Sequence, residues 1–177
     1  MRRRGFSLIR VRSRPGHRTA GVLLIGGRAI RVVLGRAGIR ANKREGDGGT
    51  PRGRFRPVRL WWRADRLPRP PTGLPVRRIT PRLAWCEDPE DRRYNRPFLR
   101  SASEPGDRLW REDHLYDLIV VLGYNDGPRI KGRGSAIFMH VAAPGLRPTQ
   151  GCIALERRHL AQLIARASRG AQISILP

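Results

Sequence analysis

The sequence has few cysteines, almost no lysine and no long apolar run, and each shortage excludes a class of protein. Cys86 and Cys152 are its only cysteines, which is too few for a disulfide-rich secreted scaffold. No stretch approaches the ~18 consecutive apolar residues of a membrane-spanning helix, so a soluble body is expected. At 177 residues the chain can bury one ordinary core, and we expect a single domain over residues 1–177.

Acids are also scarce, and they are unevenly placed. Lysine and arginine total 37 against 14 acids, a formal net charge of +23, and only Lys43 and Lys131 are lysines. Residues 82–117 hold nine of the acids beside seven arginines, so the positive charge belongs to the rest of the chain. Such a field attracts polyanions, either nucleic acid or anionic envelope polymers. An arginine-rich coding background would produce the same bias.

The N-terminal residues lack the pattern of an export signal. Seven arginines and no acid lie in residues 1–18. A signal peptide needs an apolar core of roughly 7 to 15 residues behind its charges, and here arginines interrupt it. We therefore expect residues 6–12 to form the first strand of the fold.

Runs of β-forming residues separated by turns predict a mostly β domain. Residues 21–25 and 28–34 flank Gly26-Gly27, a two-residue link typical of a hairpin. The nearly continuous apolar run at 117–123 predicts a central strand. Apolar residues at helical spacing after Glu156 predict one principal helix, ended by Gly170. Further strands are expected at residues 55–62, 135–141 and 171–176.

Residues 67–117 form a long proline-rich excursion. Its prolines exclude a long helix or a central strand, and a segment of this length in a compact domain is usually functional or disordered. Its aromatic side chains favour folding against the body. We expect it to be a lid or capping loop over a cleft, the alternative being a surface elaboration that covers a sheet.

The stretch 137–155 carries the chemistry that the sequence favours. A cysteine thiol is a useful nucleophile only as thiolate, so it needs a base beside it, and His140 precedes Cys152 by one Pro/Gly loop. Gly151 lets the backbone approach closely, so the amides of Gly151 and Cys152 could hold an oxyanion. A helix is expected directly after Cys152, where its dipole would lower the pKa of the thiol.

Four other interpretations of the sequence remain open. Cys86 and Cys152 could form a disulfide in an oxidising compartment. Zinc could bind His114, His140, His159 and Cys152, although no pair has the usual ligand spacing. A glycine-rich stretch at 46–50 suggests a phosphate loop but lacks the Gly-Lys-Ser/Thr ending. His140 alone could also be purely structural.

Two motifs of the sequence resemble the motifs of one family. The first falls on His140, Gly145, Thr149, Gly151, Cys152 and Ile153, and the second is KREGDGGTPRGRF at residues 43–55. Together they are similar to the signatures of the L,D-transpeptidases, the YkuD-type cysteine enzymes of bacterial peptidoglycan. The resemblance implies a mixed β-sandwich of the YkuD type, in which the 43–55 loop supports the catalytic strands. It implies catalysis by Cys152 and His140 without a metal or organic cofactor.

The chain departs from the family pattern at three positions. Gln150 stands where members usually have histidine, Ala154 where they have arginine, and Val141 where a polar residue often follows the catalytic histidine. We therefore expect a backbone carbonyl to orient His140 and another arginine to meet the substrate carboxylate. The candidate substrate contacts are Tyr124, Asn125 and Arg133, expected near the end of the sheet that carries His140, with Thr149 and Gln150 of the motif.

The resemblance also implies a substrate and a place. It implies cross-linking of peptidoglycan stem peptides through a thioester on Cys152, in the periplasm or cell envelope. Most members make 3-3 links, and a short branch with variant motifs makes the 1-3 link between L-alanine and diaminopimelate, which this chain resembles more. Hydrolysis of the same peptides, as a carboxypeptidase or amidase, is the nearest alternative. A basic nucleic-acid-binding protein is the alternative of another class, although no helix-turn-helix, finger or RNP pattern is present and no nucleic-acid partner is expected.

Overall fold

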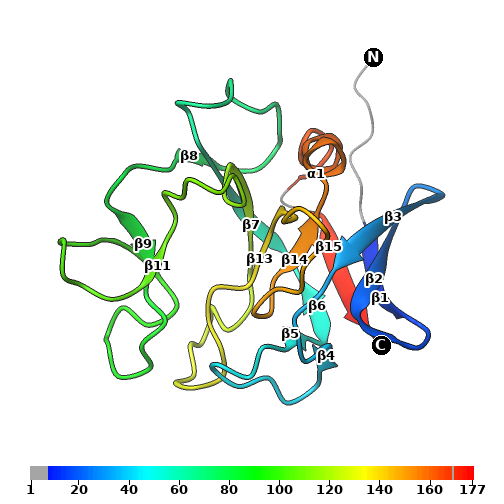
Figure 1. Cartoon of the computed structure of the whole chain (residues 1–177), viewed down its shortest axis with the longest axis horizontal. Helices are drawn as coiled ribbons and strands as arrows, with labels where there is room; N and C mark the ends of the chain where they lie inside the picture. The colour runs from blue at the N-terminus through cyan, green and yellow to red at the C-terminus, as the bar shows by residue number, and fades with distance from the viewer. Residues whose placement is uncertain (1–7, 169) are drawn as a thin grey trace.

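The computed structural model describes residues 8–168 and 170–177, which form fifteen strands and a single helix (Figure 1). This composition confirms the predicted mostly β fold with one principal helix. The predicted beginning of the first strand at Phe6 and Ser7 lies outside the described residues. The elements are β1 (Leu8–Arg14), β2 (His17–Ile25), β3 (Arg28–Val33), β4 (Ile39–Arg40), β5 (Thr50–Pro51), β6 (Gly53–Phe55), β7 (Pro57–Trp62), β8 (Val76–Arg78), β9 (Leu83–Trp85), β10 (Pro97–Leu99), β11 (Asp107–Arg108), β12 (Leu118–Leu122), β13 (Phe138–Val141), β14 (Ile153–Leu155), α1 (Arg157–Ile164) and β15 (Gln172–Leu176).

Ten strands form one mixed sheet in the order β6-β15-β1-β2-β3-β14-β13-β12-β7-β8. Only Arg56 separates β6 from β7, yet they are first and ninth in this order, so the sheet must curve until its ends approach each other. The amide of Gly123 donates to the carbonyl of Arg56 (2.9 Å), and the Phe55 ring meets Tyr124 edge-on at 5.5 Å between ring centroids. The single strand predicted over residues 55–62 is therefore divided at Arg56.

The inner face of the curved sheet holds the main core. Side chains alternate on β1, where Ile9 and Val11 are buried while Arg10 and Arg12 are exposed, as the period of two in a half-buried strand requires. The same cluster takes in residues from both halves of the sheet and from α1. Two layers of strands thus face each other across one core, which is the sandwich arrangement that the sequence predicted.

Strand β12 is buried on both faces, which explains its continuous apolar sequence. Leu118, Val120 and Leu122 belong to the main core, while Ile119 and Val121 face a second cluster under residues 67–117. The strand lies between β13 and β7. The prediction of an internal strand is confirmed.

The Gly26-Gly27 hairpin is also confirmed. β2 and β3 pair antiparallel up to Ile25 and Arg28. Both linking glycines have positive φ, +53° and +76°, as a type I′ turn requires. Glycine adopts this left-handed conformation without the clash that a Cβ would cause.

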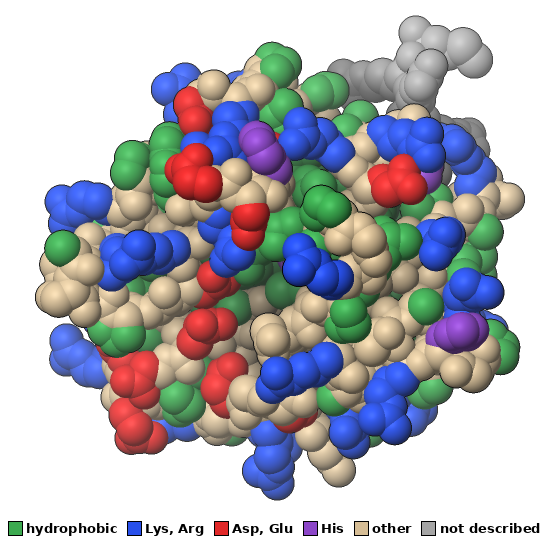
Figure 2. Space-filling model, in the orientation of Figure 1, with side chains coloured by type: hydrophobic (Ala, Val, Ile, Leu, Met, Phe, Trp, Pro, Cys, Tyr) green, Lys and Arg blue, Asp and Glu red, His purple; other side chains and the backbone are tan. Residues whose placement is uncertain are grey.

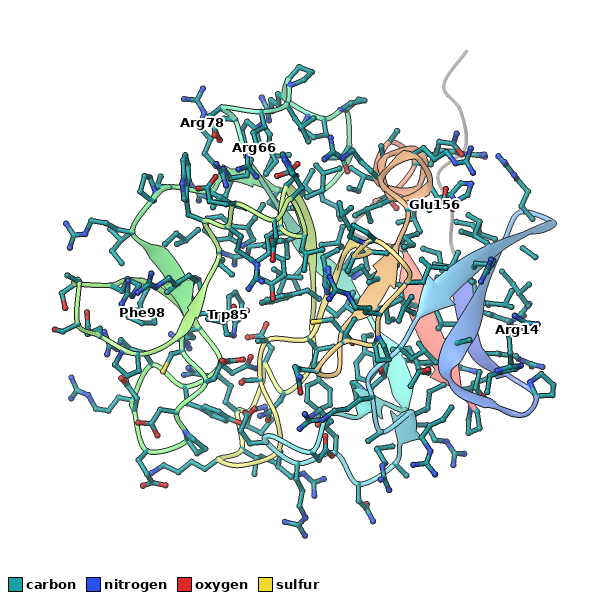
Figure 3. The ribbon with its side chains drawn as sticks, viewed as in Figure 1. Arg14, Arg66, Arg78, Trp85, Phe98 and Glu156 are labelled. Carbon is teal, nitrogen blue, oxygen red and sulfur yellow. The ribbon has the colours of Figure 1, made fainter. Side chains whose placement is uncertain are left out.

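Residues 67–117, here called the capping segment, fold against the outer face of the main sheet. β8 joins the sheet edge beside β7, and β10-β9-β11 form a separate small sheet, seen to the left of the main sheet in Figure 1. Trp85 reaches from β9 toward the main sheet, where its ring meets Phe138 edge-on at 5.0 Å (Figure 3). The aromatic residues therefore anchor the segment, as expected; its opening as a lid stays a prediction.

Buried Asn95 ties the capping segment to the loop between β12 and β13. Its Oδ1 accepts hydrogen bonds from Trp85 Nε1 (3.0 Å) and from the Ala136 amide (3.1 Å). Its Nδ2 donates to the carbonyls of Tyr124 (3.0 Å) and Asn125 (2.8 Å). One side chain with four hydrogen bonds thus fixes the backbone just before β13.

Three predicted boundaries are wrong. The strand predicted over 135–141 begins only at Phe138, because Ala136 has φ of +52° and leaves the extended conformation. The helix does not follow Cys152 directly, since β14 intervenes, and α1 ends at Ile164, well before Gly170. Within the described residues no helix is long and apolar enough to cross a membrane.

Asp117 connects three parts of the fold, which predicts a large effect of its substitution. Its carboxylate is 1% exposed and contacts Arg66 (2.8 Å), His114 Nδ1 (2.9 Å) and Arg157 of α1 (2.8 Å). Because Asp117→Asn leaves Arg66 and Arg157 without their counter-charge, we expect the free energy of unfolding to fall by about 3 kcal/mol. Urea denaturation would measure this.

Asp65→Asn is the matched control for that measurement. Asp65 also pairs with an arginine, Arg63 (2.7 Å), but its side chain is 41% exposed, and exposed pairs stabilise little. An equal loss of stability in the two variants would contradict the role given to Asp117.

Candidate active site

His140 lies on β13, and Cys152 directly precedes β14, the parallel neighbour of that strand. β13 pairs with β14 in the register Met139↔Ile153 and His140↔Ala154, so Cys152, one residue before β14, stands level with Phe138. Since side chains alternate along a strand, Phe138, His140 and Cys152 share one face. The backbones of Cys152 and His140 are then offset by about 7 Å along the strand and about 5 Å across it.

Both side chains open into one cavity of about 650 Å³. Its walls come from the main sheet, from the 43–55 loop, from the capping segment and from the loop before Cys152. Figure 2 shows the corresponding hollow near the centre of this face of the molecule. The lining residues are Lys43, Glu45, Gly46, Glu87, Asp107, Arg111, Leu115, Tyr116, Ser135, Ala136, His140, Ala143, Arg147, Pro148, Thr149, Gln150, Cys152 and Ala154.

The Cys152 thiol is held by backbone groups at the start of β13. Its Sγ donates to the carbonyl of Ala136 (3.2 Å) and accepts from the amide of Phe138 (3.4 Å). Burial raises the pKa of the thiol to about 12, although the Phe138 amide acts in the opposite direction. The residue keeps 8% of its surface exposed. The Cys152 thiol is therefore neutral at rest and lies at the wall of the cavity.

His140 is oriented by the backbone, as the sequence predicted. Its Nδ1 lies 2.8 Å from the carbonyl oxygen of Val141. A carbonyl only accepts, so Nδ1 carries the proton and Nε2 is left as the basic nitrogen. Burial lowers the pKa of His140 to about 4, which keeps the imidazole neutral. The Tyr116 ring packs edge-on against it at 5.3 Å.

A neutral thiol beside a neutral imidazole can perform general-base chemistry. His140 can take the proton as the sulfur attacks, rather than hold a preformed ion pair. The expectation that a helix dipole lowers the pKa of Cys152 is wrong, because α1 begins at Arg157, after β14. The imidazole of His140 is therefore the base that the site offers to the thiol.

The turn before Cys152 is closed by Thr149. Its Oγ1 donates to the carbonyl of Cys152 (2.7 Å) and accepts from the amide of Gly151 (3.1 Å). The predicted oxyanion donor at Gly151 is therefore already bonded to a hydroxyl, which an oxyanion would have to displace. Gln150 lines the cavity beside it.

The 43–55 loop supports this turn, as the resemblance implied. Gly151 has φ of +139°, and a Cβ on it would lie 2.8 Å from the carbonyl oxygen of Gly49. A Cβ on Gly35 would lie 2.2 Å from the carbonyl oxygen of Gly48. Thr50 Oγ1 also accepts from the amide of Gly35 (2.8 Å). Only glycine permits such close backbone packing.

Three predicted substrate contacts lie elsewhere. Tyr124 and Asn125 follow β12 at the end opposite Ile119, the residue that pairs with His140, so their expected place near His140 is wrong. Asn125 bonds the backbone of Ile130 and Gly134, and the Tyr124 hydroxyl donates to the carbonyl of Arg133. None of the three lines the cavity. Their role in substrate binding stays a prediction that the cavity lining does not support.

Several lining residues carried no motif that would have identified them. Glu87, Asp107, Arg111 and Tyr116 come from the capping segment, and Ser135 and Arg147 from loops. The cluster of acids at 82–117 was the only signal in the sequence. It could not show which of the nine acids face the cavity.

The residues named for a zinc site and those named for a disulfide do not come together in the structure. Both cysteines are free and buried, and Cys86 packs in a separate small cluster with Ala84 and Phe98. His114 contacts Asp117, and His159 lies near Glu156. Among residues 8–168 and 170–177, no group of three His, Cys, Asp or Glu is arranged to hold a metal ion.

The raised pKa of Cys152 predicts slow alkylation. With a pKa of about 12, the thiol at pH 8 supplies roughly a thousand times less thiolate than a free cysteine with pKa of about 8.5. We expect iodoacetamide to modify Cys152 far more slowly than free cysteine in a Cys86→Ser variant, with the rate rising steadily above pH 9. Rapid stoichiometric labelling at pH 7, read by mass spectrometry, would show a preformed thiolate instead.

The two hydrogen bonds of Thr149 predict a second effect. Thr149→Val keeps the shape but removes the hydroxyl, so the free energy of unfolding should fall by about 1 kcal/mol. Thr149→Ser keeps the hydroxyl and should stay close to the parent protein. Thermal denaturation of the three proteins would measure this, and a loss of stability in Thr149→Ser without one in Thr149→Val would assign the effect to the methyl group instead of the hydroxyl.

The comparisons agree with the geometry. A family comparison matches residues 14–175 to the YkuD family, described as the L,D-transpeptidase catalytic domain. Comparisons with curated proteins and with solved structures gave no match. Because the family match spans nearly the whole chain, this protein belongs to the YkuD family of L,D-transpeptidase catalytic domains.

Proposed function

We propose that the protein cross-links peptidoglycan stem peptides in the cell envelope, with Cys152 as nucleophile and His140 as general base. Membership of the family supports L,D-transpeptidase activity in general. The observation that carries the residue roles is that one cavity presents both side chains on the same face of paired strands. No other cysteine lines that cavity.

Acylation proceeds by attack of the sulfur on a donor carbonyl carbon. His140 Nε2 takes the thiol proton as the S–C bond forms. The amide of Cys152 holds the oxyanion, together with the amide of Gly151 once the oxyanion has displaced the Thr149 hydroxyl from it. As the C–N bond breaks, His140 returns the proton to the leaving amine. A thioester remains on Cys152, and the amine of a second stem resolves it to an amide and the free thiol.

Arg147 is the proposed partner of the donor carboxylate. Ala154 lies two residues after Cys152 on the same strand and also lines the cavity, so an arginine there would have pointed into it. Arg111 is already bonded to Asp113, whereas Arg147 forms no hydrogen bond or ion pair with the residues that the structure describes. Arg147 belongs to a different wall of the cavity than position 154, so it would hold the donor carboxylate in a different place. This difference supports the 1-3 linkage.

Incubation with a disaccharide-tetrapeptide tests this function. We expect a covalent acyl adduct on Cys152 by intact-mass measurement and a cross-linked dimer whose fragmentation shows the 1-3 linkage. Cys152→Ala should abolish both, because the nucleophile is gone, while Cys86→Ala should retain both.

Other outcomes would assign another activity. Dimers made by Cys152→Ala would contradict the proposal, and cleaved peptide without dimer would identify a hydrolase. Salt-sensitive DNA binding that survives Cys152→Ala, without any acyl adduct, would identify a nucleic-acid-binding protein.

A further inference from the structure

One side of the active-site cavity is acidic in a strongly basic protein. The chain has 14 acids against 37 basic residues, yet Glu45, Glu87 and Asp107 all line this cavity. We call these three residues the acidic wall. Figure 2 shows acidic side chains gathered beside the central hollow, on the side of the capping segment. If residues lined the cavity in proportion to their number in the chain, arginines would outnumber acids there.

The three carboxylates differ in the hydrogen bonds and ion pairs that they form. Glu45 accepts a hydrogen bond from the Tyr94 hydroxyl, and Asp107 accepts one from the Tyr116 hydroxyl (2.8 Å). Glu87 forms neither a hydrogen bond nor an ion pair with residues 8–168 and 170–177. A carboxylate in a cavity wall without a donor is a position that a cationic ligand can complete.

Two of the three basic side chains in the same cavity, Lys43 and Arg111, are engaged with other acids, and the third, Arg147, is the proposed partner of the donor carboxylate. Lys43 Nζ donates to Asp47 Oδ1 (2.7 Å) and to the carbonyl of Arg44 (2.6 Å). Arg111 bonds Asp113 and reaches Asp107 only at 4.0 Å. They therefore leave the charge of Glu87 available to a ligand.

Ser135 gives a second and independent indication of a ligand. The residue is 5% exposed and lines the cavity, and its Oγ has no hydrogen-bond partner among the described residues. It directly precedes Ala136, whose carbonyl accepts the Cys152 thiol. A buried hydroxyl without a partner is costly, and one beside the nucleophile can bond a polar group that arrives at the sulfur.

We propose that the acidic wall, with Glu87 as its unpaired carboxylate, and Ser135 form the acceptor subsite, which binds a primary ammonium group and delivers it to the thioester. The inference rests on the acyl-transfer function proposed above and names the chemical class of its second substrate. Arg147 and Gln150 belong to the loop before Cys152, so the donor and the acceptor are held by different segments of the chain.

The proton balance of aminolysis explains why a carboxylate is useful there. An ammonium ion has no lone pair, so Glu87 first accepts one proton from it and later releases that proton to water. The neutral amine forms the N–C bond, its next proton passes to His140, and His140 protonates the sulfur as the C–S bond breaks. The products are an amide, a free thiol and one released proton.

The surroundings of Glu87 suit that task. Glu87 is an exposed residue that lines the cavity. Partial withdrawal of its carboxyl from water, together with the charges of Asp107 and Glu45, raises the pKa of Glu87 to about 7, with Lys43 acting in the opposite direction. A base with this pKa accepts a proton near neutrality more readily than an ordinary carboxylate does. Burial also raises the pKa of Asp107.

Glu87→Gln tests the proposal, because water and amine compete for the same thioester. The donor is a stem tetrapeptide, and the acceptor is a stem tripeptide ending in diaminopimelate. We expect the rate of acyl-enzyme formation and the rate of hydrolysis to be unchanged, while the ratio of amide product to hydrolysed product falls about fivefold to tenfold. Glu90→Gln, an exposed acid paired with Lys131 outside the cavity, should leave the ratio unchanged.

The pH dependence of the same ratio separates charge from shape. Glu87 is ionised above pH 7 and protonated below it, so the advantage of the parent protein over Glu87→Gln should shrink as the pH falls below about 7. A difference that does not change with pH would assign the effect to shape.

The outcomes also distinguish this inference from the proposed function. An unchanged product ratio in Glu87→Gln, with a normal acyl-enzyme, overturns the acceptor subsite alone. Loss of acyl-enzyme formation in Glu87→Gln, with a circular dichroism spectrum like that of the parent, would place the acidic wall on the donor side and also overturn it. Absence of an acyl-enzyme in the parent protein overturns the proposed function itself.

Discussion

The active site depends on the parallel pairing of β13 with β14. Parallel neighbours cannot be joined by a tight hairpin, so the chain leaves His140 through an open loop and returns at Cys152. Their register puts the two side chains on one face, two residues apart. A shift by one residue would turn the thiol to the opposite face. The 43–55 loop opposes such a shift, since its backbone packs directly on Gly151 and Gly35.

Burial gives this site its chemical character. The same low-dielectric surroundings raise the pKa of the thiol to about 12 and lower that of the imidazole to about 4, because burial penalises whichever form is charged. The resting pair is neutral and unreactive toward water or stray electrophiles. In the proposed reaction, a substrate brings an electrophilic carbonyl to the sulfur while His140 accepts the proton.

The distribution of charge follows the division between body and capping segment. Arginines occupy exposed positions on strands such as β1, where alternation sends them outward. The capping segment brings most of the acids, and two of them, Glu87 and Asp107, reach the cavity. Asn95 couples the same segment to the backbone at Ala136, which holds the thiol. The capping segment therefore builds the site as well as covering it.

Local patterns in the sequence determined the β class, the Gly26-Gly27 hairpin, the internal strand β12 and the pairing of His140 with Cys152 in one motif. These features depend on neighbouring residues, through side-chain alternation, turn chemistry and a short motif. Only the tertiary structure decided which acids of residues 82–117 line the cavity beside Cys152, that Tyr124, Asn125 and Arg133 do not line it, and that β14 separates Cys152 from α1. Those outcomes depend on contacts between segments far apart in the chain, and on a left-handed residue, Ala136, held by a side chain 41 positions earlier, for which no local pattern exists.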